Sequence, residues 1–195
     1  MSVLVPTLSA GESRLATLLR RRGLAVEEIQ VGTIVPRAEE IPADADWVVV
    51  VSRNSVASLV RSLRGRRPVK IAAVGERTAE ALRQAGLAVD FVPSSATSAV
   101  LHAELAQRLA PGARVCDFKG YANVSVPLAA PVDLSRHTAA YFTCASSAER
   151  LFAVATGATR CLAIGPSTAA ALRRLGAAVV VQAPASTLEA LARLD

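Results

Sequence analysis

The sequence predicts an α/β protein built from parallel sheets in two similar domains. One observation is a local pattern: an apolar strand, a turn at Gly75 and a helix over 77–85 whose Ala79 and Leu82 share one face. Another is that this pattern returns at 163–175, which indicates an internal duplication. The third is composition, because 52% of the residues are apolar and only 4% aromatic. Small aliphatic cores are typical of strands that helices cover on both faces.

Hydrophobic periodicity and turn residues place the elements in order. A strand at 2–6 leads to a helix that Ser9 can cap, with Glu12 as its capping-box partner, and Gly23 ends this helix. Residues 24–35 are extended, and the polar, proline-containing segment 36–45 is interpreted as a linker. The first copy then holds strands at 47–51, 69–74 and 87–92, and helices at 54–64, 77–85 and 97–109.

A strand at 113–118 opens the second copy. Pro127 and Pro131 prevent a helix as long as the first one, so this copy has lost most of a helix and a strand. It resumes with strands at 139–143, 160–164 and 178–182, and helices at 146–155, 167–175 and 186–194.

Alternating strands and helices predict parallel sheets, in which ligands bind beyond the carboxyl ends of the strands. Four strand-to-helix turns are therefore predicted to bind substrate and to face one cleft between the lobes. Their residues are Ser52, Arg53, Asn54 and Ser55; Gly75, Arg77 and Thr78; Cys144, Ser146 and Ser147; and Gly165, Ser167 and Thr168. Hydroxyls and free N–H groups at a helix N-terminus suit a carboxylate or a phosphate. The alternative is that these Ser and Thr residues only cap their helices.

Charge and composition limit the partners. The net charge of +6 indicates an anionic ligand, or alternatively a surface on which Arg simply replaces Lys. No nucleic-acid motif is present, and no apolar run approaches the roughly 18 residues that span a bilayer. The N-terminus does not resemble a signal peptide. The odd number of cysteines, Cys116, Cys144 and Cys161, predicts buried reduced thiols in a cytoplasmic protein.

Other kinds of site have little support. His102, His137, Cys116 and Cys144 lack the spacing of metal ligands, so no metal is expected. Nucleotide-binding glycine motifs and the Gly-x-Ser-x-Gly elbow are absent. His102 is expected to be a partly exposed residue within a helix, whereas His137 precedes a strand and is a candidate general acid. Lys119 and Tyr121 follow a strand end, where they either face the cleft or form an ordinary surface turn.

Three motifs resemble the uroporphyrinogen-III synthase family. They are Val-Gly-x-x-Thr-Ala-x-x-Leu-x-x-x-Gly at 74–86 with its counterpart at 164–176, the Ser-x-Asn-Ser-Val turn at 52–56, and the terminal segment 183–191. The resemblance implies two flavodoxin-like lobes joined by extended linkers: residues 1–34 with 138–195, and residues 35–137, shortened near 119–137. It also implies a cytoplasmic, cofactor-independent monomer that dehydrates and closes hydroxymethylbilane, a linear tetrapyrrole with eight carboxylates, inverting the last pyrrole.

The sequence departs from the family at two places. Val5-Pro6-Thr7 stands where the family usually carries an Arg at the end of its first strand. The family's Tyr that assists loss of the hydroxyl belongs to the missing helix–strand unit, so Tyr121 or Tyr141 is the candidate replacement, with His137 as the third catalytic candidate. Two alternatives therefore remain: a relative that cyclises or dehydrates a different substrate, and a non-catalytic protein that binds an anionic ligand.

Overall fold

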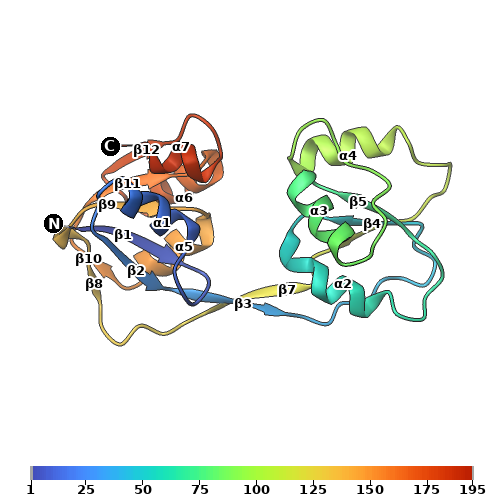
Figure 1. Cartoon of the computed structure of the whole chain (residues 1–195), viewed down its shortest axis with the longest axis horizontal. Coiled ribbons are helices and arrows are strands. Elements are labelled where there is room, and N and C mark those ends of the chain that lie inside the picture. Colours follow the sequence, from blue (N-terminus) through green and yellow to red (C-terminus); the bar gives the residue numbers. More distant parts are fainter. Residues whose placement is uncertain (1, 195) are drawn as a thin grey trace. The chain divides into compact units, whose positions relative to one another are not determined.

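The computed structural model describes residues 2–194 and divides into two compact units (Figure 1). Unit 1 comprises Met1–Thr33 with Asn123–Asp195, and unit 2 comprises Ile34–Ala122. Met1 and Asp195, which the predicted domain ranges include, lie outside the described residues. The second predicted boundary, at 137, differs from the structure, because the segment after Ala122 pairs within unit 1. For example, the Val126 N–H donates to the Val31 carbonyl oxygen at 3.2 Å.

Unit 1 is built on a five-stranded parallel sheet. Its strands are β1 (Ser2–Thr7), β2 (Val26–Gln30), β9 (His137–Phe142), β11 (Arg160–Ala163) and β12 (Val179–Gln182). They lie in the order β12-β11-β9-β1-β2, and every neighbouring pair is parallel. Numbered along the chain, this is the 2-1-3-4-5 order of flavodoxin-like sheets. Its strand order reverses between β1 and β9.

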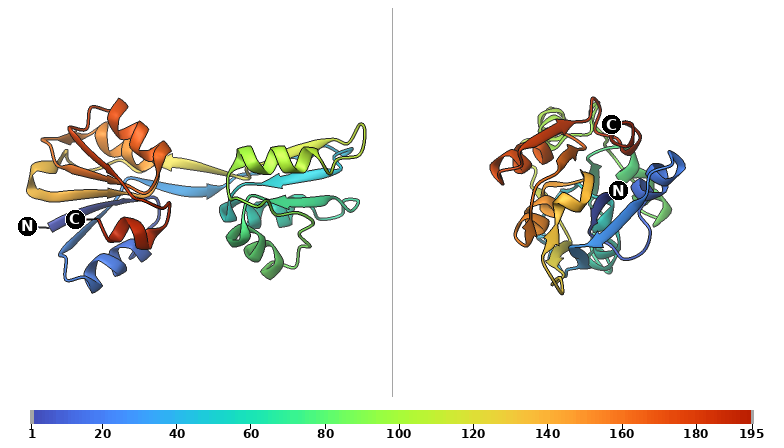
Figure 2. Two further views of the ribbon diagram at one scale, coloured as in Figure 1. Left: turned by 90° about the horizontal axis from the view of Figure 1, so that it is seen from above. Right: turned by 90° about the vertical axis from the view of Figure 1, so that its left-hand side faces the viewer.

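Helices cover both faces of this sheet (Figure 2). On one face α1 (Arg14–Arg21) and α7 (Leu188–Ala192) bury Leu15, Leu19 and Leu191 against apolar strand residues. On the other, α5 (Ala145–Phe152) and α6 (Pro166–Arg174) bury Leu151 and Leu172. The core residues recur every three or four positions along each helix, which is the expected spacing for one buried face.

Unit 2 has a smaller parallel sheet of the same kind. Its strands β4 (Trp47–Val50), β5 (Lys70–Ala73) and β6 (Val115–Phe118) lie in the order β5-β4-β6. The helices α2 (Val56–Ser62) and α3 (Glu76–Gln84) pack on one face, and α4 (Ser98–Ala106) packs on the other. The predicted strand at 87–92 reduces to a single bridge between Ala72 and Phe91.

The remaining elements are short. The strands β3 (Gly32–Pro36) and β7 (Tyr121–Ser125) pair with each other and cross the boundary between the units. In unit 1, β8 (Val132–Asp133) pairs with β10 (Ala155–Thr156). Among residues 2–194 there are also two 3₁₀ turns, η1 (Arg53–Ser55) and η2 (Leu134–Arg136). Among the described residues, no helix has both the length and the apolar character needed to cross a membrane.

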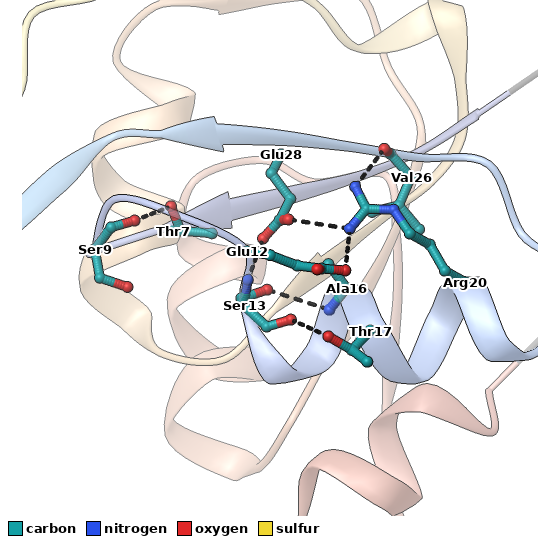
Figure 3. A network of polar contacts seen from close by, with 9 residues as sticks. All are labelled: Thr7, Ser9, Glu12, Ser13, Ala16, Thr17, Arg20, Val26 and Glu28. Atoms are coloured by element: carbon teal, nitrogen blue, oxygen red, sulfur yellow. Dashed lines mark hydrogen bonds and ion pairs between the residues drawn. The ribbon is translucent and has the colours of Figure 1, made fainter.

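The cap of α1 differs from the prediction (Figure 3). Ser13 rather than Ser9 is the N-cap, and its Oγ accepts the Ala16 N–H at 3.1 Å. The Ser9 carbonyl instead accepts the Thr7 hydroxyl at 3.0 Å, within the turn that precedes the helix. Glu28 of β2 accepts the Ser13 N–H at 2.9 Å, so a strand residue takes the role predicted for Glu12.

Arg20 ties the start of α1 to β2. Its guanidinium donates to Glu12 at 2.6 Å, to Glu28 at 3.4 Å and to the Val26 carbonyl at 3.1 Å (Figure 3). This network fixes the turn between β1 and α1, which lies at the carboxyl end of β1.

Candidate functional site

The strand registers identify equivalent strands in the two sheets. Ala139 of β9 pairs with β1 on one side and with β11 on the other. Trp47 of β4 occupies the same place between β6 and β5. Thus β4 corresponds to β9, and β6 corresponds to β1. Because ligands of open α/β sheets bind where the strand order reverses, the carboxyl ends of β1 and β9 and those of β6 and β4 are the candidate sites.

Three of the four predicted turns lead into helices whose first N–H groups have no side-chain cap. The N-caps are Gly75 for α3, Cys144 for α5 and Gly165 for α6, and none accepts a hydrogen bond through a side chain. By contrast, Thr97 and Thr187 cap α4 and α7 through their hydroxyls. The alternative, in which the Ser and Thr residues of the turns only cap their helices, therefore does not describe these three turns. Their N–H groups are donors suited to an anionic oxygen.

The fourth turn is partly capped. The Ser52 hydroxyl accepts the Asn54 N–H at 3.2 Å at the start of η1, while α2, which follows, has no side-chain cap. Arg53 and Asn54 are exposed at this turn.

The last residue of each predicted turn is a buried hydroxyl residue, namely Ser55, Thr78, Ser147 and Thr168. Two of them brace backbone carbonyls. The Ser55 Oγ donates to the Lys119 oxygen at 2.5 Å, and the Ser147 Oγ donates to the Cys144 oxygen at 2.9 Å. These side chains shape the turns rather than present a hydroxyl to solvent. The Ser55 bond also joins the predicted turn after β4 to the one after β6.

Gly75 and Gly165 lack a side chain at places where a loop packs closely against the turn. A Cβ on Gly75 would lie 2.7 Å from the Ala96 Cβ, and one on Gly165 would lie 2.6 Å from the Ser186 Oγ. Both glycines have extended backbones, so space rather than conformation requires them.

Cationic and polar side chains lie exposed beside the turns. Arg53, Arg77 and Ser167 are exposed, while Cys144 and Ser146 are half-buried with Sγ and Oγ 3.3 Å apart. Within residues 2–194, neither Arg53 nor Arg77 forms an ion pair. Both guanidinium groups can therefore pair with carboxylates of a ligand.

Unit 2 has a pocket of about 350 Å³ at its switch point. Its apolar lining consists of Val49, Val51 and Phe118, and its polar lining consists of Ser98, His102, Asp117, Lys119 and Tyr121. The predicted residues Lys119 and Tyr121 thus meet there, with the Lys119 Nζ 5.7 Å from the centre of the Tyr121 ring.

His102 lies partly exposed within α4, as expected, but its pairing with Asp117 was not predicted. The His102 Nε2 lies 3.1 Å from the Asp117 Oδ1, and its Nδ1 lies 2.7 Å from the Ser98 carbonyl oxygen. The hydrogen bond to Asp117, supported by that to Ser98, raises the pKa of His102 above its usual value. The two residues come from α4 and β6, and only the spatial arrangement of these elements brings them together.

His137 and Tyr141 are both buried. His137 starts β9 at the amino edge of the sheet, with its Nδ1 3.0 Å from the Ser2 Oγ and its Nε2 3.9 Å from Glu27. Tyr141 is only 2% exposed, and its hydroxyl donates to the Leu194 oxygen at 3.0 Å. These contacts give both residues structural roles, and they leave Tyr121 as the tyrosine beside a pocket.

The thiols also differ from the prediction. All three cysteines are free, but only Cys161 is buried, whereas Cys116 and Cys144 are half-buried. Burial raises the pKa of the Cys161 thiol to about 11. Among residues 2–194, no group of three or more His, Cys, Asp or Glu side chains is arranged to hold a metal ion.

Comparison with known proteins gives consistent matches. A family model described as "Uroporphyrinogen-III synthase HemD" matches residues 13–127 and 124–193. A uroporphyrinogen-III synthase from Synechococcus elongatus is 32% identical over a segment that covers 46% of this chain and 40% of that protein, so the match spans less than half of that relative.

Solved structures show the same fold. A uroporphyrinogen-III synthetase from Helicobacter pylori matches with a TM-score of 0.67 at 18% identity, covering 98% of this chain and 96% of that one. A mutant uroporphyrinogen III synthase from the extremely thermophilic bacterium Thermus thermophilus matches with a TM-score of 0.55 at 20% identity and the same coverage. Since the family model extends over nearly the whole sequence, the chain belongs to the uroporphyrinogen-III synthase family.

Proposed function

We propose that the protein is a cofactor-independent lyase of tetrapyrrole biosynthesis that closes hydroxymethylbilane to uroporphyrinogen III. The observation that carries this proposal is the family match over residues 13–127 and 124–193. The reaction removes the terminal hydroxyl as water and joins the two ends of the chain with inversion of the last pyrrole, through a spiro intermediate.

The turns of the two units are suited to a polycarboxylate. The uncapped helices α3, α5 and α6 offer N–H groups to anionic oxygens, and Arg53, Arg77 and Lys119 supply positive charge. Holding the two ends of a flexible chain together lowers the entropic part of the barrier without a strong base or nucleophile.

Tyr121 is the residue proposed to assist loss of the hydroxyl. It lines the unit 2 pocket with Lys119, while the Tyr141 hydroxyl is already engaged by the Leu194 oxygen. A phenol can donate a hydrogen bond to the leaving oxygen. Tyr121→Phe is expected to lower kcat more than it raises KM, because the contact would strengthen as the hydroxyl leaves.

The finer features of the fold support an internal duplication. Gly75 and Gly165 are each the uncapped N-cap of a nine-residue helix, each is crowded by a covering loop, and each follows an equivalent strand. We further propose that the protein acts as a monomer in the cytoplasm, because each unit has its own apolar core and the three cysteines are free. Sedimentation of the purified chain at micromolar concentration tests the monomer.

A coupled assay tests the activity. Porphobilinogen and its deaminase supply hydroxymethylbilane, and the oxidised products are separated into type I and type III isomers. Arg53→Ala and Arg77→Ala are each expected to raise KM about 10-fold, as for the loss of one charge-assisted contact. Arg64→Ala, at an exposed arginine outside the predicted turns, is the control with unchanged KM. Binding of hydroxymethylbilane without formation of type III would instead support the non-catalytic alternative.

A further inference from the structure

One face of the unit 2 sheet lacks the cover that its counterpart has in unit 1. By the strand registers, Val115 corresponds to Val3, and Asp117 corresponds to Val5. Val3 and Val5 are 3% and 1% exposed, in the core that α1 and α7 cover. Val115 is 39% exposed, and the Asp117 side chain is 69% exposed.

The difference follows from the chain's course after β6. In unit 1 the chain leaves β1, forms α1 and returns as β2. In the described part of unit 2, it passes from β6 through Lys119 and Gly120 directly into β7, with no intervening helix. The place beside α4 that corresponds to α1 is therefore open, and the pocket lined by Val49, His102 and Asp117 lies there.

The lining of this pocket specifies the chemistry of its ligand. Its volume of about 350 Å³ lies within the usual range for small-molecule sites. Val51, which is 38% exposed, offers apolar surface to a flat ring, and the buried residues Val49 and Phe118 complete the apolar lining. The rim carries one carboxylate, Asp117, and one ammonium group, Lys119. A matching ligand is an aromatic ring that carries an N–H donor for the Asp117 carboxylate and a carboxylate for the Lys119 ammonium group.

Asp117 is held in place to accept such a hydrogen bond. Its Oδ1 receives the His102 Nε2–H at 3.1 Å, and the ring is fixed from the other side by the Ser98 carbonyl. The exposed Asp117 carboxylate has further lone pairs available for a ligand. The Lys119 ammonium, 5.7 Å from the Tyr121 ring centre, lies beside the same opening.

We propose that this pocket binds one pyrrole ring of the linear tetrapyrrole, with Asp117 accepting the ring N–H and Lys119 pairing with a carboxylate substituent. His102 is a positioning residue that orients Asp117. The identification of the ring as a tetrapyrrole's rests on the proposed function. In unit 1, α1 packs on the sheet at the corresponding position. In unit 2, the same position is proposed to bind substrate.

A monopyrrole probe tests this site without requiring turnover. Porphobilinogen, which carries a pyrrole N–H and two carboxylates, is titrated into the ¹⁵N-labelled full-length chain. The amides of Val51, Ser98 and Lys119, which line the pocket, are expected to shift most. The expected Kd is about 1 mM, so the titration extends to about 20 mM porphobilinogen. Chemical shift changes confined to other regions, or none at that concentration, would overturn the proposal.

Matched variants assign the roles. Asp117→Asn and Lys119→Met are each expected to weaken porphobilinogen binding about 10-fold, as for the loss of a hydrogen bond to a charged group. Two control variants make the same chemical changes away from the pocket: Glu80→Gln on α3 neutralises a carboxylate, and Lys70→Met at the start of β5 removes an ammonium group. Both should leave the Kd of porphobilinogen unchanged. Ser98→Phe, at an exposed lining residue, should block the pocket without altering the core.

His102 requires a separate comparison. His102→Gln keeps a donor for Asp117 and should bind the probe like the wild type, whereas His102→Ala should weaken binding several-fold. Equal binding by all the pocket variants would overturn the proposal. If wild-type protein forms type III isomer while these variants bind the probe normally, the activity stands and the pocket assignment fails. If the probe binds as expected but no type III isomer forms, the pocket stands and the proposed function fails.

Discussion

At the scale of single residues, short polar contacts decide which of several similar side chains matters. Ser9 and Ser13 both precede α1, yet only the Ser13 Oγ accepts a helix N–H. Ser13→Ala is expected to lower the free energy of unfolding by about 1 kcal/mol, and Ser9→Ala by less than about 0.5 kcal/mol. Urea denaturation of both variants measures the difference. Equal losses would contradict the assignment of the cap.

His102 gives a pH-dependent prediction at the same scale. The hydrogen bond to Asp117 raises its pKa above 6.5, so the charged imidazole is favoured in the folded protein. Its contribution to stability is therefore fully present below the unfolded pKa and is lost as pH rises through the folded value. An NMR titration should show a raised pKa for His102 in the wild type. The pKa of His102 should be lower in the Asp117→Asn variant than in the wild type. His137→Gln assigns the two histidine signals, and an unchanged pKa in Asp117→Asn would contradict this cause.

At the scale of elements, the turns after the strands depend on close packing by loops. A Cβ on Gly75 would lie 2.7 Å from the Ala96 Cβ. Gly75→Ala is expected to lower the free energy of unfolding by about 1–3 kcal/mol, through overpacking against the loop. Adding Ala96→Gly should recover part of that loss, which a double-mutant cycle measures as a coupling energy. Strictly additive effects of the two changes would contradict the steric explanation.

The order of the main strands and helices could be predicted from the sequence, apart from the strand expected at 87–92, because each of these elements carries its own periodicity. The positions of the turns at the carboxyl ends of the strands could be inferred from that order. The roles of His137 and Tyr141 could not. A strand that starts at His137 puts this residue at the amino edge, away from the turns, and the Tyr141 hydroxyl is bonded within the core. The pairing of His102 with Asp117 depends on how α4 lies over β6, which local periodicity does not encode.

At the scale of the whole molecule, each unit has its own core. The only tryptophan, Trp47, lies in unit 2, so its fluorescence reports on that unit. Leu82→Ala, in the unit 2 core, is expected to cost about 2–5 kcal/mol and to lower the urea midpoint of Trp fluorescence. Leu162→Ala, in the unit 1 core, should lower the midpoint of circular dichroism while leaving the Trp47 midpoint unchanged. A shift of the Trp47 midpoint in Leu162→Ala would show that the units unfold together.

We propose that the whole chain, in which no helix of the described residues lies between β6 and β7, closes hydroxymethylbilane with inversion of the last pyrrole. The most direct measurement is the isomer composition of the product when wild-type protein is added to porphobilinogen and its deaminase. We predict type III isomer in excess of the uncatalysed background, which gives type I, without added metal or cofactor. Type I alone, from protein shown to be folded, would contradict the account.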